Sequence, residues 1–477
     1  MVNLSLAALE SDWPILISLS CSTNPSWVLL RQCIKPFVAA LYFNKLRCRD
    51  ESLEVLCGTD GDKGRIMIGL GTSITPGAKA MFYCHDTYGL GHLRRTLTLA
   101  NHLRWFVPDI SQLIVTGSPV AHRFPLPEGT DFIKLPSVTK NSAGNYEPRS
   151  LSSSIESVRN MRRDIFLSAA RHFEPDFVII DHAPAGLKGE ALPALRHLKE
   201  KLPRTKLIVG LRDVMDEATT VRASWARDGA YELFDDIYDQ ILVYGNRNFY
   251  DVVSEYGLSA KAAAKTRFVG YLGREPGARS REDVRASLGM QTDKLLVVTA
   301  GGGGDGKALF GAMLRDLQIK RPSDFDCLIV GGPLLSEADR TELRSGFGDR
   351  GNVHFLDFTD DLASYLGAAD AVVSMGGYNS VCEILSLKQP AIIVPRTAPR
   401  KEQLIRATML SGRGLVQMIH PRDLAPAHLL DSVHELMTNP VPNRPSLAMD
   451  GLGNMTQALG SLHPHQAWWP ETSAISA

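Results

Sequence analysis

The sequence predicts two tandem α/β domains, each built on an open, doubly wound parallel sheet, and three observations support this class. From Lys79 onward, short apolar runs alternate with stretches of helical periodicity, which is the pattern of parallel βα units. A polar stretch rich in Gly, Pro and Arg at 273–283 interrupts the alternation, and the same pattern then restarts. A chain of 477 residues is also too long for one ordinary core, which favours two domains with additional material.

The expected elements follow from the apolar runs and the spacing between them. In the first half we expect strands at 80–85, 112–117, 131–136, 176–181, 206–211, 240–245 and 267–272, with helices at 92–106, 151–172, 190–201 and 219–234. In the second half we expect strands at 294–300, 325–331, 352–357, 370–375, 390–395 and 414–419, with helices at 306–317, 336–346, 360–368, 379–387, 400–411 and 426–438. Such sheets bind ligands at the carboxyl ends of their strands, so we expect the site in a cleft between the halves.

The chain divides by pattern into an extension, two domains and a tail, at 1–78, 79–272, 273–445 and 446–477. The extension has irregular periodicity and holds four of the seven cysteines. A start of translation at Met67 or Met81 is the alternative to a functional extension. We place no chemistry in the extension.

Composition excludes several classes of partner. Lys plus Arg and Asp plus Glu number 52 each, so no electrostatic footprint for nucleic acid is present. The cysteines form no CxxC pair, which fits a reducing cytoplasm better than a disulfide framework or a zinc site. The start of the chain lacks the basic region of a secretory signal, and the apolar run at 27–43 is broken by Arg31, Lys35 and Pro36. We expect a cytoplasmic protein, with a peripheral position at the inner membrane face as the alternative.

A run of glycines opens the second domain between its first strand and first helix. It comprises Gly301, Gly302, Gly303 and Gly304. Glycine lets the backbone approach a phosphate closely, and a helix start favours an anion. The spacing matches neither a Walker A loop nor a complete dinucleotide fingerprint, so a merely tight turn is the alternative to a diphosphate site. We expect Asp305, whose charge would repel a diphosphate, to cap the following helix.

A second glycine turn, Gly376 and Gly377, precedes the helix that begins near Asn379. Asn379 and Glu383 are four residues apart and therefore share a face of this helix, near its positive end. A carboxylate there can accept two hydrogen bonds from a vicinal diol such as ribose. A solvated glutamate is the alternative.

The first domain has a glycine turn of its own, with Gly89 and Gly91 followed by His92. A histidine at a helix start tends to be neutral, so His92 is a candidate general base. The alternative is that His92 only caps or orients the loop, in which case His85 and Asp86 are the next candidates for the base.

Charged residues also stand at the carboxyl ends of two later strands of the first domain. Asp181 and His182 come at the end of the strand expected at 176–181, and Arg212 and Asp213 follow the strand expected at 206–211. Carboxyl ends of parallel strands face the crevice. We expect Asp181 to contact the acceptor or to partner His92, and Asp213 to belong to the loops of the cleft. A structural Arg–Asp pair that closes a loop is the competing interpretation.

The segment at 374–406 resembles the carboxyl-terminal domain of the glycosyltransferase family that includes the peptidoglycan N-acetylglucosaminyltransferase, and bacterial proteins known only as predicted glycosyltransferases. The similarity covers about residues 294–420 well. It implies the GT-B fold, two Rossmann-like domains with a cleft between them. It also implies that Glu383 holds the ribose of UDP, that Phe358 and Thr359 line the uracil pocket, and that Glu402 and Gln403 bind hydroxyls of the donor sugar.

By this resemblance the protein is an inverting glycosyltransferase that moves a hexosyl group, with N-acetylhexosaminyl included, from a UDP-sugar to an acceptor. The acceptor is a saccharide, a lipid-linked sugar or a small molecule, which suits polysaccharide or cell-envelope biosynthesis. No DxD motif lies in a suitable loop, so we expect neither a metal nor a cofactor. The alternatives are a UDP-sugar hydrolase or epimerase on the same fold and a non-catalytic nucleotide-sugar-binding protein.

One helix, 92–106, bears on contact with a membrane. It carries Arg94, Arg95 and Arg104 beside Trp105 and Phe106, which could rest on an anionic bilayer if the acceptor is a lipid. Packing of this helix on its own sheet is the interpretation we favour.

Overall fold

The computed structural model describes residues 77–86, 90–141, 145–319, 324–347, 351–439 and 447–462, and four short strands before residue 77. The chain divides into two compact units, Met1–Pro76 and Gly77–Ala477. In the first unit, β1 (Val2–Ala7) pairs antiparallel with β2 (Leu16–Cys21), and β3 (Leu53–Glu54) with β4 (Gly69–Leu70). All that follows concerns the second unit.

The first sheet of this unit has seven strands in the order β13-β12-β11-β10-β5-β6-β7, all paired parallel. They are β5 (Lys79–Cys84), β6 (Ser111–Thr116), β7 (Thr130–Lys134), β10 (Phe177–Asp181), β11 (Lys206–Arg212), β12 (Gln240–Tyr244) and β13 (Thr266–Phe268). After β5 the chain adds β6 and β7 on one side of the sheet, and it then returns to add β10, β11, β12 and β13 on the other side. The switch point therefore lies between β5 and β10, where a crevice opens at the carboxyl ends.

The second sheet has six parallel strands in the order β16-β15-β14-β17-β18-β19. They are β14 (Leu295–Thr299), β15 (Asp326–Val330), β16 (Val353–Leu356), β17 (Ala371–Ser374), β18 (Ala391–Ile393) and β19 (Gln417–Met418). Its switch point lies between β14 and β17, the two strands that precede the glycine turns. Both sheets confirm the doubly wound class predicted from the sequence.

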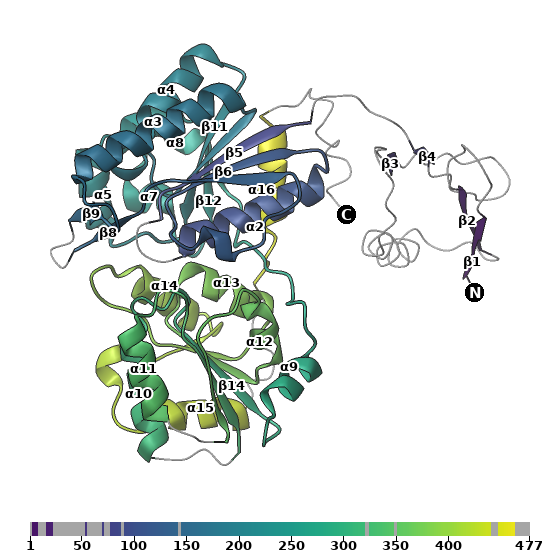
Figure 1. The fold of residues 1–477 in the computed structure, drawn as a ribbon, viewed down its shortest axis with the longest axis vertical. Coiled ribbons are helices and arrows are strands. Elements are labelled where there is room, and N and C mark those ends of the chain that lie inside the picture. The colour runs from purple at the N-terminus through teal and green to yellow at the C-terminus, as the bar shows by residue number, and fades with distance from the viewer. Residues whose placement is uncertain are drawn as a thin grey trace. The chain divides into compact units, whose positions relative to one another are not determined.

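Helices cover both faces of each sheet (Figure 1). Those between the strands of the first sheet are α2 (Gly91–Phe106), α3 (Ile155–Phe173), α4 (Leu192–Lys201), α5 (Ala218–Arg227), α6 (Ala230–Glu232), a π-helical turn at Leu233–Ile237, α7 (Val252–Tyr256) and α8 (Ala260–Ala264). Those of the second are α9 (Arg281–Leu288), α10 (Lys307–Ile319), α11 (Glu337–Phe347), α12 (Leu362–Ala368), α13 (Tyr378–Ser386), α14 (Glu402–Ser411) and α15 (His428–Thr438). Local chemistry sets their ends: Ser154 caps α3 through the amide of Ser157, and Gly257 ends α7 at a left-handed φ of 68°.

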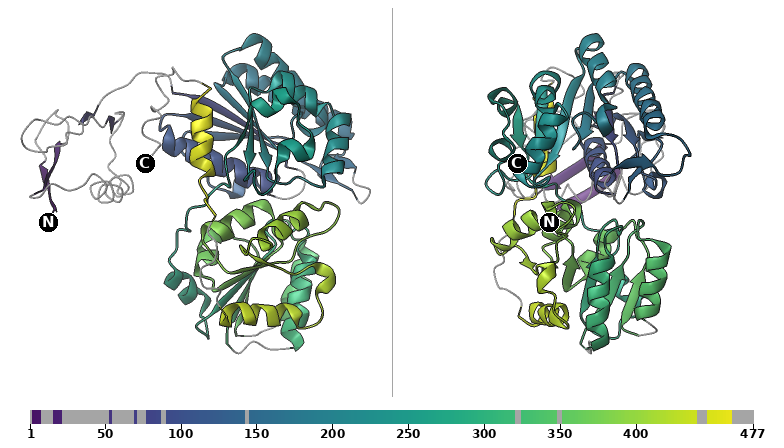
Figure 2. Two further views of the ribbon diagram at one scale, coloured as in Figure 1. Left: turned by 180° about the vertical axis from the view of Figure 1, so that it is seen from behind. Right: turned by 90° about the vertical axis from the view of Figure 1, so that its left-hand side faces the viewer.

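The segment 446–477, which we set apart as a tail, holds a last helix, α16 (Gly451–Gly460). Met455 and Leu459 of α16 are fully buried in one core with Leu97 and Leu103 of α2. Figure 2 shows this helix, in yellow, lying along the first sheet. The chain thus returns from the second domain to the first, because the apolar side of α16 finds its partner there.

Helices α7 and α8 were not expected from the pattern, and neither were two further elements. Strands β8 (Val138–Lys140) and β9 (Tyr146–Pro148) form an antiparallel pair apart from the main sheet. Helix α9 lies where the stretch between the domains is polar; Ser280 caps it and Val284 is its one buried residue. Both elements are too short and too polar for their periodicity to be visible in the sequence.

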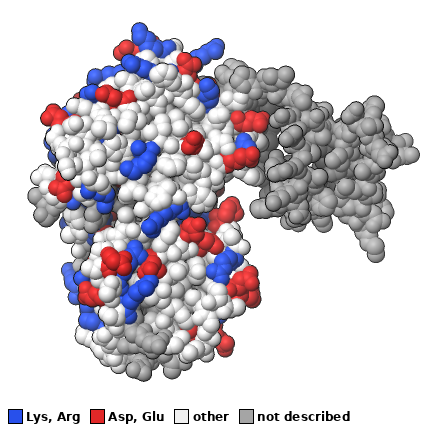
Figure 3. Space-filling view, viewed as in Figure 1, with Lys and Arg blue, Asp and Glu red and all other residues white. Residues whose placement is uncertain are grey.

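Surface charge is mixed in sign, and Figure 3 shows Lys and Arg interspersed with Asp and Glu over the described part of one face. Each arginine of α2 that could face a membrane has an acidic partner instead, Arg94 in Glu383, Arg95 in Asp181 and Arg104 in Glu128. Leu93, Leu97 and Leu103 pack this helix on its sheet, while Trp105 is 77% exposed. Within the described ranges, no helix combines the length and the apolar character needed to cross a membrane.

Candidate active site

The switch points of the two sheets meet around one cavity of about 160 Å³. Its wall from the first domain includes Gly91, Arg94, Arg95 and Arg212. The second domain contributes Gly301, Gly302 and Gly304 of the first glycine turn, Gly377 and Asn379 of the second, and Glu402 and Gln403 from the start of α14. Most of the predicted donor residues therefore line a single space.

The glycine run after β14 needs glycine for a steric reason. Gly301 and Gly303 have φ values of 66° and 85°, and a Cβ on Gly303 would come 2.2 Å from the carbonyl oxygen of Gly331. Asp305, expected to cap α10, instead places Oδ2 2.6 Å from Nη1 of Arg396. This ion pair neutralises the carboxylate that would repel a diphosphate at the turn.

At the second glycine turn, Asn379 and Glu383 both contact the first domain. Asn379 Nδ2 donates to the carbonyl oxygen of Gly91 at 3.0 Å, and its Oδ1 accepts from Arg274 Nη2 at 3.0 Å. Glu383 is 2% exposed and forms an ion pair with Arg94. Its second oxygen, Oε2, is buried and has no hydrogen-bond partner in the described structure. The burial of Glu383 excludes the alternative of a solvated glutamate.

The structure brings His92 and Asp181 together, one at the start of α2 and the other at the end of β10. His92 Nδ1 lies 2.5 Å from Asp181 Oδ2, and Arg95 grips the same carboxylate through Nε at 2.7 Å and Nη2 at 2.5 Å. Burial alone would raise the pKa of Asp181, but the charge of Arg95 and the hydrogen bond with His92 outweigh it and hold that pKa well below its usual range. An ionised Asp181 fixes the ring of His92 through Nδ1 and leaves Nε2 for another partner.

Two histidine rings lie beside His92: that of His85, one of the two other candidates for the base, and that of His182. The ring centroids of His85 and His182 are 4.6 Å and 5.3 Å from that of His92. Burial, aided by neighbouring positive charges, lowers the pKa of both rings well below the ordinary value, so both are neutral. Asp86 is also buried, and Oδ1 accepts from the amide of Leu93 at 3.4 Å, which makes it part of the turn before α2.

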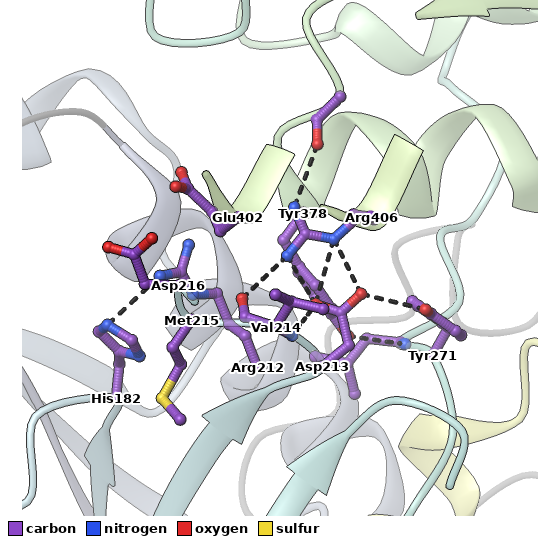
Figure 4. A network of polar contacts seen from close by, with 12 residues as sticks. His182, Arg212, Asp213, Val214, Met215, Asp216, Tyr271, Tyr378, Glu402 and Arg406 are labelled. Carbon is purple, nitrogen blue, oxygen red and sulfur yellow. Dashed lines mark hydrogen bonds and ion pairs between the residues drawn. The ribbon is translucent and has the colours of Figure 1, made fainter. Parts of the chain in front are cut away.

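Asp213, assigned to the cleft loops, does not line the cavity; it joins the two domains. Its carboxylate binds Arg406 of α14, with Nη2 at 2.6 Å and Nε at 2.8 Å, and accepts from Tyr271 Oη at 3.0 Å (Figure 4). Arg406 also donates to the carbonyl oxygens of Gly376 and Val214. The structural Arg–Asp pair weighed from the sequence is thus present, with Arg406 in place of Arg212.

The remaining candidates fall into two groups. Glu402 and Gln403 lie in the cavity wall and hold Arg396, with Glu402 Oε1 2.5 Å from Arg396 Nη2. Phe358 lies outside the wall, its ring 5.9 Å from that of Phe124 of the first domain, and Thr359 Oγ1 accepts from the amide of Asp361. The assignment of Phe358 and Thr359 to a uracil pocket therefore stays a prediction. Gly89 lies outside the described residues. In the ranges the structure describes, no group of three or more His, Cys, Asp or Glu could hold a metal ion.

The sequence pattern assigns no binding role to the arginines of the cavity wall. The pattern offers Arg94 as a membrane contact and Arg212 as half of an Arg–Asp pair, and it does not single out Arg396. Each has a positional signal, because Arg94 comes shortly after Gly91, Arg212 is the last residue of β11, and Arg396 comes three residues after the end of β18. The position of these arginines near the carboxyl ends of the strands is the signal that could have identified them.

The fold and the site define a two-domain protein of the GT-B type. Residues 296–451 match the glycosyltransferase family 28 C-terminal domain. Over 156 residues the chain is 28% identical to the UDP-N-acetylglucosamine–N-acetylmuramyl-(pentapeptide) pyrophosphoryl-undecaprenol N-acetylglucosamine transferase of Clostridium kluyveri, which is 32% of this chain and 42% of that relative. The chain therefore spans less than half the length of this relative.

Two solved structures show the same fold over most of the chain. A glycosyltransferase from Rickettsia africae has a TM-score of 0.51 at 11% identity, with 82% of this chain and 100% of that one covered. A UDP-N-acetylglucosamine 2-epimerase has a TM-score of 0.51 at 12% identity, with 83% and 99% covered. The similarity to solved structures thus extends across both domains, whereas the family match lies in the second.

Proposed function

We propose that this protein transfers a hexosyl group from a UDP-sugar to the hydroxyl of an acceptor. The term hexosyl here covers N-acetylhexosaminyl groups. One observation carries the proposal: a single cavity is lined by the glycine turns of the family 28 domain and by Gly91 and Arg94, which stand on either side of His92 at the start of α2. The proposed donor groups thus lie next to the helix start that carries the candidate base.

On the donor side, the amides of Gly301–Gly304 and the start of α13 suit a diphosphate, with Arg396 already neutralised by Asp305 and Glu402. Glu383 is assigned to the ribose, Phe358 and Thr359 to the uracil, and Glu402 and Gln403 to hydroxyls of the sugar. Positive helix ends and the backbone amides of the glycine turns can meet the diphosphate charge, so the proposed reaction uses neither a metal nor a cofactor.

On the acceptor side, His92 Nε2 takes the proton of the acceptor hydroxyl as its oxygen attacks the anomeric carbon. The bond from that carbon to the diphosphate oxygen breaks, UDP leaves from the opposite face, and the anomeric centre inverts. Asp181 stabilises the imidazolium that forms, since its carboxylate stays ionised and bound to Nδ1. A cytoplasmic or peripheral location stays a prediction.

The test separates transfer from its rivals on the same fold. Purified protein is first screened by thermal shift against UDP, UDP-glucose, UDP-N-acetylglucosamine and dTDP-glucose, and a donor that binds should raise the melting temperature. The donor that binds is then incubated alone and with candidate acceptors, and we expect rapid release of UDP only with an acceptor. Stoichiometric release of free sugar, or formation of a 2-epimer, without any acceptor would replace transfer by hydrolysis or epimerisation. Absence of any nucleotide-sugar binding would reject the donor site itself.

A further inference from the structure

Tyr378, the first residue of α13, lines the cavity, and its buried ring has two buried guanidinium groups close to it. Cζ of Arg95, on α2 of the first domain, lies over the ring at 5.5 Å from its centroid. Cζ of Arg406, on α14 of the second domain, lies 5.7 Å from the same centroid. An aromatic ring attracts a cation over its face, and the attraction is stronger where water is excluded. One tyrosine therefore stabilises positive charges from both domains.

Arg95 connects this ring to the candidate base. Its Nε and Nη2 donate to the two carboxylate oxygens of Asp181, at 2.7 Å and 2.5 Å. The same carboxylate lies 2.5 Å from Nδ1 of His92. A continuous series of contacts thus runs from the second domain, through Tyr378, to the ring of His92.

Two other residues of α13 hold the same end of α2. Asn379 Nδ2 donates to the carbonyl oxygen of Gly91 at 3.0 Å. Glu383 forms an ion pair with Arg94. Because Gly91 and Arg94 stand on either side of His92, the helix start that carries the candidate base is held by α13 from the second domain.

The place of the Tyr378 ring is set by the second glycine turn and by its neighbours. Gly376 has a φ of 78°, which glycine adopts without strain, and its carbonyl oxygen accepts from Nη1 of Arg406 at 3.1 Å. The ring of Tyr271 stacks on that of Tyr378, with centroids 6.1 Å apart and an interplanar angle of 19°. Oη of Tyr378 accepts from the amide of Leu272 at 3.4 Å. Figure 4 shows Tyr378 and Tyr271 beside Arg406. The ring is thus fixed on several sides, as a group that orients another must be.

We infer that Tyr378 is a positioning residue that acts on the proposed base from the other domain. Its ring keeps the guanidinium of Arg95 on the carboxylate of Asp181, and that carboxylate orients the ring of His92. The inference rests on the proposed transfer reaction, in which His92 takes the proton of the acceptor. It means that the base is ready only while α13 lies against α2, so one set of contacts brings the donor-side helix and the base together.

The alternative is that Tyr378 only fills the apolar core that it shares with Tyr271 and Cys382. In that case an aliphatic side chain of similar size would cost stability and leave His92 unchanged. If the ring positions Arg95, the aliphatic side chain also removes the attraction for that guanidinium. The two roles therefore differ in what happens at His92.

The sign of the expected change follows from the charges around His92. The positive charge of Arg95 compensates that of Asp181, and a guanidinium that shifts away leaves the carboxylate with a stronger attraction for a proton on His92. The ring should then titrate at a higher pH. The other titratable groups around it are the same in every variant: the rings of His85 and His182 and the carboxylate of Asp86.

Heteronuclear NMR of the histidine rings measures this titration in the free protein and in the UDP complex, and the signal of His92 is identified by its absence in His92→Gln. Tyr378→Leu and Tyr378→Met remove the aromatic ring, whereas Tyr378→Phe keeps it and loses only the contact with the amide of Leu272. Phe234→Leu removes a fully buried ring from a separate apolar core of the first domain and is the control for lost packing. We expect His92 to titrate about half a pH unit or more higher in Tyr378→Leu and Tyr378→Met, and as in wild type in Tyr378→Phe and Phe234→Leu.

Rates of transfer test the same link in the reaction itself. With the donor and acceptor found in the transfer assay, we expect kcat to fall about tenfold or more in Tyr378→Leu, because a displaced base reacts poorly. Tyr378→Phe should restore kcat to within about threefold of wild type. The affinity for UDP should fall by a smaller factor than kcat in Tyr378→Leu, since the ring acts on the base. The double variant Tyr378→Leu with Arg95→Lys should lose less than the product of the single losses, because both changes break one series of contacts.

Three outcomes would overturn the inference. They are an unchanged titration of His92 in both variants that lack the ring, an equal shift in Phe234→Leu, and equal effects of Tyr378→Phe and Tyr378→Leu, which would assign the role to the hydroxyl. Failure of UDP to bind, or failure of the wild type to transfer sugar, would instead reject the proposed function. The titration of the free protein would still decide in that case whether Tyr378 acts on His92.

Discussion

The guanidinium of Arg94, from the first domain, forms an ion pair with the carboxylate of Glu383. Glu383 is the residue that we propose binds the ribose of the donor. The side chain of Glu383 is almost fully buried, and its second oxygen is unpartnered. A donor that uses Glu383 must therefore replace this ion pair or bind at the free oxygen beside it.

Replacement of Arg94 by Gln tests this relationship. We expect the unliganded variant to melt roughly 3–8 °C below wild type, because Glu383 loses its counter-charge inside the protein. UDP should then stabilise the variant more than wild type, since the ribose no longer competes with Arg94. Arg104→Gln is the matched control, because it removes an arginine of the same helix whose partner, Glu128, is exposed. Equal UDP-induced shifts in Arg94→Gln and wild type would show that the ribose does not displace Arg94.

His92→Gln and Asp181→Asn test the proposed base. We expect His92→Gln to lower kcat by about 10²–10⁴-fold, the usual contribution of a general base. Asp181→Asn should lower kcat as well, because the ring of His92 loses the carboxylate that orients it. UDP affinity should be unchanged in His92→Gln. The exposed His122→Gln serves as control. A kcat within about threefold of wild type for His92→Gln would assign the base elsewhere.

The buried histidines predict a loss of stability in mild acid. The pKa of His182 is lowered by burial and by Arg212, so the folded protein keeps this ring neutral while the unfolded chain protonates it below about pH 6.5. The contribution of the neutral His182 ring to the free energy of unfolding is present above that pH. It is lost as the pH falls through the pKa of His182 in the folded protein. Melting temperatures from pH 8 to pH 5 should fall less steeply for His182→Asn, and Asn suits the left-handed φ of 69° there. Parallel slopes for variant and wild type would contradict the assignment.

The pair of Asp213 and Arg406 should be the strongest single tie between the domains. Both side chains are buried, so Arg406→Met leaves an uncompensated carboxylate and should cost about 3–5 kcal/mol in denaturant unfolding. Tyr271→Phe removes one hydrogen bond to the same carboxylate and should cost only about 0.5–1.5 kcal/mol. The double variant Asp213→Asn with Arg406→Met should cost less than the sum of the single changes. Additive costs would mean that the two groups do not interact.

Replacement of Gly303 by Ala tests whether the first glycine turn belongs to the donor site, and replacement of Gly311 by Ala is its control. Gly303→Ala would place a Cβ 2.2 Å from the carbonyl oxygen of Gly331 at a φ of 85°, so we expect weaker UDP binding and lower stability. Gly311→Ala, in the middle of α10, would meet only the end of the Arg315 side chain and should stabilise by about 0.5–1 kcal/mol. Thermal melts with and without UDP compare them. Unaltered UDP affinity in Gly303→Ala would remove the turn from the donor site.

The sequence by itself determined the two sheets and marked the glycine turns that line the cavity. Runs such as 176–181 and 294–300 are buried on both faces and therefore read as continuous apolar stretches, and the turns after β14 and β17 are marked by glycine. These signals are local, because helix and strand periods and turn chemistry act over a few neighbouring residues. His92 and Glu383 could be found for the same reason: each stands at a fixed offset from a glycine turn.

Only the tertiary structure decided which charges meet. Arg94 and Glu383 lie 289 residues apart, and Asp213 and Arg406 lie 193 residues apart, so no local pattern pairs them. The same holds for α16, whose apolar side finds its core in the first domain although the chain reaches it from the second. Such contacts depend on how separately formed elements pack, and an isolated arginine in a sequence gives no sign of which carboxylate, if any, will neutralise it. That is why the pairing of Arg94 with Glu383 becomes visible only in the folded chain.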